Sequence, residues 1–129
     1  MGSTSLLTSA ARTADATATL PVSPKADFYI IVDVTVDPAS ASITPRLQVC
    51  DSVSGQWFVV WDGTAITAVG TYTYYFTRSG DPLTAVNDIT EVAEVHLHTA
   101  GSMTRFYMTH ADSDSITYTV AHLDVDPIA

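Results

Sequence analysis

Alternating acidic and histidine side chains are the strongest candidates for chemistry in this sequence. Glu94, His96 and His98 occupy every second position of one segment. Because alternate side chains of a β-strand point to the same face, a strand here would bring one carboxylate and two imidazoles together. Zinc prefers such ligands, and His110 or His122 would supply a further nitrogen donor. The pattern is compatible with a zinc site carried by a strand.

The same alternation has a structural interpretation that needs no ligand. It places Val95 and Leu97 in a core and the intervening polar side chains in water, as in a sheet with one solvated face. Nothing in the sequence brings the distant histidines within the ligand distance of about 2 Å that zinc requires. We therefore favour the structural interpretation and predict neither a metal nor a cofactor.

Other catalytic patterns are weak or missing. The sequence has no G-x-S-x-G motif, no Walker loop and no glycine-rich dinucleotide fingerprint. Its one cysteine, Cys50, lies in no cysteine-hydrolase signature and is predicted to lie off the core face as a small apolar side chain. The acidic residues considered for calcium are Asp112, Asp114, Asp124 and Asp126. They lack the glycine and terminal glutamate of an EF-hand loop, so we predict turn roles, no catalytic residue and no enzymatic activity.

The elements that must position these residues are strands. In the clearest run, Phe28–Val36, every second residue is apolar and faces one side. Comparable runs follow at residues 46–50, 56–61, 71–77, 92–98, 104–110 and 116–125. Turn residues separate them, and no helical periodicity competes. We predict an all-β fold: an antiparallel β-sandwich or barrel-like domain of about seven strands.

Short turns between these runs predict hairpins. The segment Asp51–Gly55 combines local hydrogen bonding by Asp and Ser with a glycine that tolerates positive φ. Asp62 and Gly63 form a second hairpin-type dipeptide. Residues 111–115 predict a third hairpin, between the last two strands. Residues 78–90 form a long irregular connection, the best candidate for a specialised loop.

The first 25 residues are predicted to be an extended N-terminal arm, followed by a β-sandwich domain over residues 26–129. Ser, Thr and Ala dominate the arm, which offers little apolar surface to bury. Pro21 and Pro24 close it. We expect its deletion to leave the domain folded. No cationic stretch precedes Leu6 and Leu7, so we expect no secretory signal and a cytoplasmic site of synthesis.

Composition excludes several classes of partner. The formal net charge is -9, from five Lys and Arg against 14 Asp and Glu, which disfavours nucleic acid. One cysteine cannot form an internal disulfide. No apolar run approaches the length of about 20 residues that a membrane helix needs, so we predict no membrane contact.

Two tryptophans on one predicted strand raise the question of a binding surface. Strict alternation places Trp57 and Trp61 on one face with Val59. Sandwich core is the favoured interpretation, and a protein interface or a sugar-stacking platform stay open as alternatives. Tyr29 and Tyr75 lie opposite the main apolar faces of their strands and are predicted at a surface or in a second layer.

The order of several segments resembles small structural proteins of tailed bacteriophages. These segments are Leu6–Arg12, Phe28–Val36, Asp51–Gly55 and Thr109–Tyr118. The resemblance covers most of the chain but includes no catalytic signature. Among such proteins, small acidic β-rich members include capsid decoration, or cement, proteins, which bind the assembled major capsid shell and reinforce it.

This resemblance implies a non-enzymatic virion component on the capsid exterior that binds the major capsid protein. Self-association, with trimers as one option, is a further expectation. The alternatives are a tail, neck or head-tail junction component, or a carbohydrate-binding module for host attachment. The residues predicted to contact a partner are Leu6, Leu7, Arg12, Trp57, Trp61, Leu83 and Val86.

Overall fold

The structure, a computed structural model, describes residues 3–20, 28–36, 42–77, 90–94, 103–111 and 114–124. Across these ranges all regular structure is β. The strands are β1 (Ser3–Arg12), β2 (Ala16–Thr19), β3 (Phe28–Val36), β4 (Ile43–Cys50), β5 (Trp57–Asp62), β6 (Gly70–Thr77), β7 (Glu91–Glu94), β8 (Thr104–His110) and β9 (Ile116–Asp124). No helix long and apolar enough to cross a membrane occurs in these ranges.

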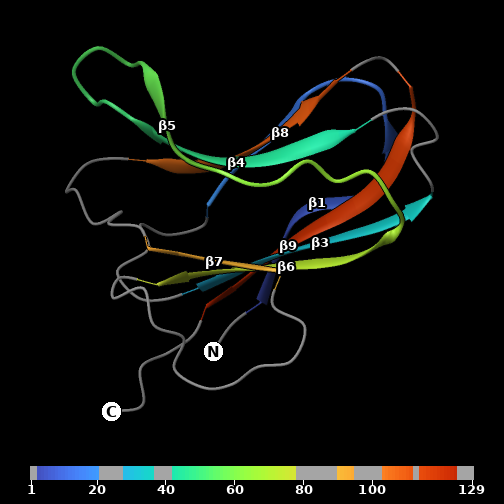
Figure 1. The fold of residues 1–129 in the computed structure, drawn as a ribbon. Coiled ribbons are helices and arrows are strands. Elements are labelled where there is room, and N and C mark those ends of the chain that lie inside the picture. Colours follow the sequence, from blue (N-terminus) through green and yellow to red (C-terminus); the bar gives the residue numbers. More distant parts are fainter. Residues whose placement is uncertain are drawn as a thin grey trace.

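Two sheets form the two layers of a sandwich (Figure 1). One sheet has five strands in the order β1-β9-β3-β6-β7, and the other has four in the order β2-β8-β4-β5. All neighbours are antiparallel except β6 and β7, which run parallel. The predicted all-β sandwich is confirmed, and the described residues form no closed barrel.

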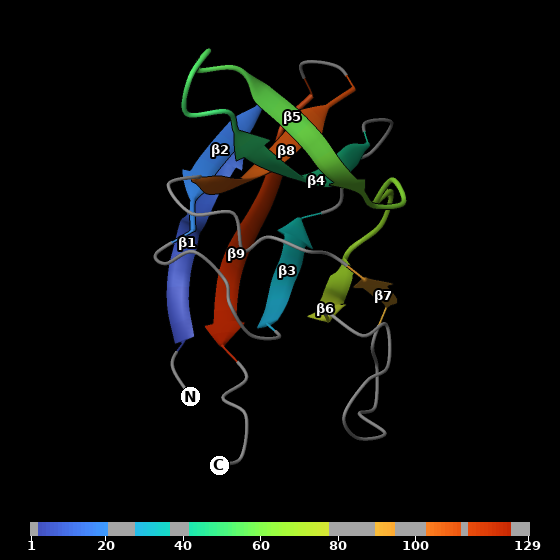
Figure 2. The ribbon, with the colours of Figure 1, turned by 90° about the vertical axis from the view of Figure 1, so that its left-hand side faces the viewer.

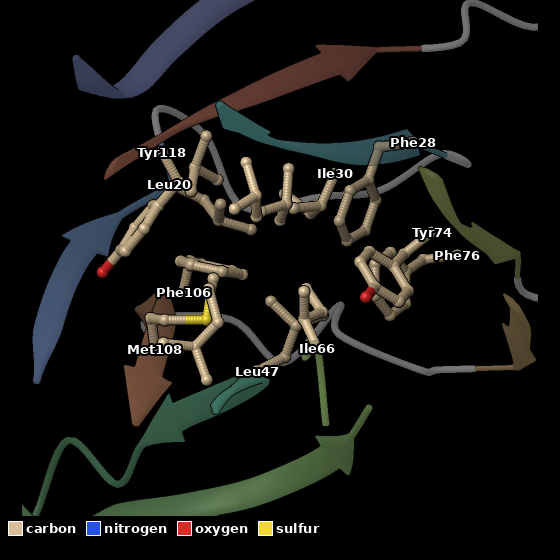
Figure 3. Close-up of a cluster of buried hydrophobic side chains, with 14 of the residues drawn as sticks. Leu20, Phe28, Ile30, Leu47, Ile66, Tyr74, Phe76, Phe106, Met108 and Tyr118 are labelled. Carbon is tan, nitrogen blue, oxygen red and sulfur yellow. The ribbon is translucent and has the colours of Figure 1, made fainter. Parts of the chain in front are cut away.

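The core lies between the layers because alternate residues of the inner strands are apolar. β3 alternates between buried and half-buried residues from Phe28 to Val34, as predicted, and only its last apolar residue, Val36, is exposed. From the other sheet, Leu47, Phe106 and Met108 point back toward this layer (Figure 3). Alternation on each sheet thus produces one shared apolar interior.

On the outer face of the five-stranded sheet, two tyrosines form a further layer. The rings of Tyr29 and Tyr75 are stacked, with centroids 4.7 Å apart. They lie opposite the core faces of β3 and β6, as predicted. The prediction left open a surface or a second layer. Tyr75 is only 1% exposed, so it lies in a second layer.

The N-terminal residues are integral strands of this sandwich and not a separate arm. β1 is an edge strand of the five-stranded sheet, and β2 is an edge strand of the four-stranded sheet. Leu20 is buried, while Leu6 and Leu7 pack against the core. The segment is extended, as expected, and backbone hydrogen bonds pair it with its neighbouring strands. Its side chains are mostly Ser, Thr and Ala, so the sequence shows no apolar alternation that would predict these strands. The boundary predicted at residue 25 therefore divides strands of the same two sheets.

Two of the three predicted hairpins are wrong because the chain changes sheets. Gly63 donates its backbone N–H to Pro45 O at 2.8 Å and so extends β5 along β4. Further on, Ile43 and Ile66 form a bridge before the chain crosses to β6 in the other sheet. The connection from β8 to β9 also crosses between sheets. A turn dipeptide signals a reversal without specifying which sheet receives the next strand.

The predicted hairpin between β4 and β5 is confirmed in detail. The carboxylate of Asp51 accepts hydrogen bonds from the backbone N–H groups of Val53 and Ser54 and from the Ser54 hydroxyl. These hydrogen bonds lower the pKa of Asp51 below its usual 3.8, and the bond from the Ser54 hydroxyl has the largest effect. Gly55 has φ +74°, a conformation that glycine adopts without steric cost.

Candidate functional site

The histidine set is only partly within the described residues. His96 and His98 lie outside them, and Glu94 is the last residue of β7. His122 is fully buried on β9, with its ring 5.2 Å from Phe28. His110 is at the end of β8. Among the described residues no three His, Cys, Asp or Glu side chains gather as metal ligands.

His110 and His122 do not converge. The His110 ring lies 2.8 Å, Nε2 to hydroxyl, from Tyr118. Tyr118 precedes His122 by four residues on β9, which is about 13 Å along a strand. Burial raises the pKa of Tyr118 to about 12, so the hydroxyl stays protonated at neutral pH. The two histidines therefore belong to different ends of the interior and cannot share one ion.

A polar cluster around Asp15 fastens the β1–β2 connection to β8. One Asp15 oxygen accepts the backbone N–H of His110 at 2.8 Å, and the other accepts the Tyr107 hydroxyl at 2.9 Å. The His110 N–H is the main reason that the pKa of Asp15 lies below its usual 3.8. Next to this cluster, the Arg12 guanidinium lies over the Tyr118 ring and donates to Tyr118 O at 2.8 Å. These contacts are internal, so Arg12, predicted to bind a partner, is used to hold its own strand.

The predicted tryptophan face does not exist, because β5 contains a bulge. Trp57 is opposite Cys50 and Val59 is opposite Gln48, but Leu47 pairs with Trp61. Val60 is thus an extra residue that has no partner in this register, and it reverses the alternation. The prediction that Trp57 and Trp61 share a face is wrong.

The two rings consequently have different surroundings. Trp61 faces the interior, where its ring meets Tyr74 at 5.2 Å and Phe76 at 4.8 Å in edge-on contacts. Trp57 lies on the outer face of the four-stranded sheet beside Cys50, which is off the core face as predicted. Core is therefore the correct interpretation for Trp61 alone.

An arginine from β8 holds the outward tryptophan. Arg105 is opposite Gln48 of β4, and its Nε donates to Gln48 Oε1 at 2.7 Å. Its guanidinium carbon lies 4.0 Å from the centroid of Trp57, on the strand beyond β4. It also lies 5.4 Å from the Tyr107 ring. The Arg105 side chain thus crosses β4 and links three strands of the outer face.

Exposed apolar side chains lie along the same sheet edge. Among the described strands β5 has β4 alone as a neighbour, and it runs along the top of the molecule in Figure 2. Phe58, Val59 and Val60 are 52%, 44% and 41% exposed. Met103, whose carbonyl accepts the Cys50 N–H, is 52% exposed. We call the following residues the hairpin surface: Trp57, Phe58, Val59, Val60, Met103 and Arg105.

Sequence reasoning identified only part of this surface. Of the residues predicted to contact a partner, Trp57 lies on it, Trp61 does not, and Leu83 and Val86 lie outside the described residues. Leu6 and Leu7 are half-buried against the core. Arg105 was missed. Its alternation with Phe106 would have placed it on the outer face, but nothing in the sequence indicates that it reaches Trp57.

Comparison with known proteins gives little guidance. No family model and no curated protein matches the chain. The chain is similar to a solved structure of PfGH50B at 13% identity and a TM-score of 0.47, over 98% of this chain and 23% of that one. The chain thus spans less than a quarter of that protein, and a similarity this distant says nothing of what the chain binds or does.

Proposed function

We propose that the chain is a non-enzymatic virion structural protein, a decoration or cement protein that binds the major capsid protein on the outside of the head. The observation that carries the proposal is the hairpin surface, where exposed apolar side chains lie at a sheet edge beside the half-buried Trp57 and Arg105. Patches of exposed apolar residues on soluble proteins commonly mark interaction sites. Tryptophan, tyrosine and arginine are also the side chains that contribute most to protein interfaces.

The geometry of the edge suits a protein partner. No described strand pairs with the edge of β5 that points away from β4, so the backbone groups of that edge can pair with an extended segment of a partner. The bulge at Val60 twists and shortens that ladder, which favours a specific partner over open-ended aggregation. A sandwich that is rigid behind this edge loses little conformational entropy on binding.

The net charge of the chain and the resemblance of its sequence to phage structural proteins also support this proposal. A net charge of -9 keeps free copies apart and disfavours the packaged genome as a partner, so we place the protein outside the shell. The resemblance of the sequence to small acidic phage structural proteins specifies the shell as the partner. Many copies on one shell would add avidity to contacts that are individually weak.

The test uses empty shells assembled from the major capsid protein encoded in the same genome, without this chain. We expect saturable binding in sedimentation assays and a higher melting temperature for the decorated shells. Failure to bind mature shells would contradict the proposal. Attachment to purified tails would favour another virion position.

A carbohydrate-binding function predicts a different result. The platform of Trp57 and Trp61 on which it depended is absent, because Trp61 faces the interior. Binding to a glycan array that is lost in Trp57→Ala, together with no shell binding, would replace the proposed function with this one.

A further inference from the structure

We infer that Arg105 is the specificity anchor of the hairpin surface and that it binds a carboxylate, an Asp or Glu side chain on the exterior of the shell protein. This inference rests on the proposed function and specifies the chemistry of the partner at that same surface. It starts from the surroundings of the three arginines that the structure describes.

Two of these arginines are already occupied. Arg12 donates to the carbonyl oxygens of Thr8, Ala10 and Tyr118. Arg46 lies on the same outer face as Arg105, and its Nε is 2.6 Å from an oxygen of Asp62. Both guanidinium groups are therefore committed to partners within the chain.

Arg105 differs from Arg46 because its hydrogen-bond partner is a neutral amide and not a carboxylate. Its Nε donates to Gln48, and among the described residues no carboxylate pairs with its guanidinium. No described residue accepts a hydrogen bond from its two terminal nitrogens, which are parallel donors with the geometry that matches the two oxygens of a carboxylate. In a chain with a net charge of -9, this is a positive group that no carboxylate of the described residues neutralises.

The group is also held in place before binding. The Trp57 ring lies against the guanidinium at 4.0 Å, and the Gln48 bond fixes its rotation. Arginine loses less entropy on binding when its planar group is already oriented. Val59 is exposed and opposite Gln48, so it lies on the same face as Trp57 and would exclude water around the ion pair.

The charge distribution favours an acidic partner residue over a second copy. A second copy that met this surface with its own would bring a second Arg105, and two guanidinium groups repel each other. The copies also share a net charge of -9. A carboxylate on the shell would instead neutralise Arg105, and such an ion pair would set both register and specificity.

The experiment compares two arginines on one face, with the same shells as probe. Arg105→Gln is expected to weaken shell binding at least about tenfold, because it removes the charge and the paired donors. Arg46→Gln is the matched control and should change affinity less than about twofold, since Arg46 is already neutralised and exposed pairs contribute little. Raising NaCl from about 50 mM to about 500 mM should weaken the wild type more than Arg105→Gln.

A second variant keeps the test decisive if Arg105→Gln folds poorly. Arg105→Lys retains the charge but loses the paired donors, so affinity between those of the wild type and Arg105→Gln is expected. Wild-type affinity in either Arg105 variant would overturn the inference and leave the proposed function standing. Equal weakening by Arg46→Gln would also overturn it, because a general charge effect would then suffice. No shell binding by the wild type would overturn both, and Arg105-dependent binding of oligogalacturonate would then assign the carboxylate to a sugar.

Discussion

The two tryptophans of β5 lie four residues apart and have opposite roles. Trp61 packs edge-on against Tyr74 and Phe76 in the interior. Trp57 lies under the guanidinium of Arg105 on the outer face. One strand therefore belongs both to the core that stabilises the fold and to the surface proposed to bind a partner. The extra residue at Val60 produces this division.

Residue type alone does not assign a side chain to the core or the surface. The two residues are chemically identical, and strict alternation predicts one face for both. A single inserted residue reverses that assignment and places one ring in each environment. Mutations on the core side should therefore change stability, and mutations on the outer side should change binding.

The largest expected effect on the core side comes from deleting residues 2–20. The deletion removes an edge strand from each sheet, the buried Leu20 and the packing of Leu6 and Leu7. Burying a leucine contributes about 1.5–3 kcal/mol, so the free energy of unfolding should fall by at least about 4 kcal/mol. Urea denaturation followed by circular dichroism measures it. A truncated protein as stable as the full chain would restore the earlier expectation of an arm outside the domain.

Trp61→Ala, compared with Trp57→Ala, tests whether the two tryptophans of β5 have different surroundings. Loss of the ring from its contacts with Tyr74 and Phe76 should lower the free energy of unfolding by about 3 kcal/mol. The matched control, Trp57→Ala, should lower it by less than about 1 kcal/mol, because its ring is on the solvent side. Equal losses in the two variants would show that the rings share one environment.

Gly63→Ala tests how tightly the residues after the bulge are packed. A Cβ here would lie 2.7 Å from the Trp61 ring and 2.8 Å from the Pro45 side chain. Relieving these overlaps would displace the inward tryptophan, and overpacking of this kind costs about 2 kcal/mol. The melting temperature should fall. Gly55→Ala tests backbone strain alone, since nothing lies near a Cβ at that position.

The smallest expected effect comes from acid titration of Asp15, which contacts β8 and not β5. Because the pKa of Asp15 is lowered on folding, its contribution is present above pH 3.8 and is lost as pH falls below that value. The difference in unfolding free energy between the wild type and Asp15→Asn should thus be constant near neutral pH and shrink toward zero in acid. A difference in unfolding free energy that grows as the pH falls would contradict this prediction.

The sequence predicted the strands that carry apolar alternation but not how they assemble. β3 and β6 were placed with the correct inward faces, because one buried face imposes period two. β1 and β2 were missed as strands because Ser, Thr and Ala give no such pattern. The sheet crossings after Gly63 and Ala111 were read as hairpins, since local turn chemistry carries no information about the receiving sheet.

The candidate site was less predictable for the same reason. Trp57 was identified, but its separation from Trp61 depends on a bulge that no residue type announces. Arg105 is 48 residues from Trp57 in sequence, and only the strand order β8-β4-β5 brings them together. Contacts that depend on sheet order lie beyond pattern reasoning from one sequence.

Electron cryomicroscopy of shells decorated with the wild-type protein would show which face of the sandwich meets the shell. We expect density for one sandwich at each occupied position, with β5 and the outer face of the four-stranded sheet against the capsid protein and an acidic side chain at Arg105. Attachment through the five-stranded sheet, with Trp57 and Arg105 facing solvent, would contradict it.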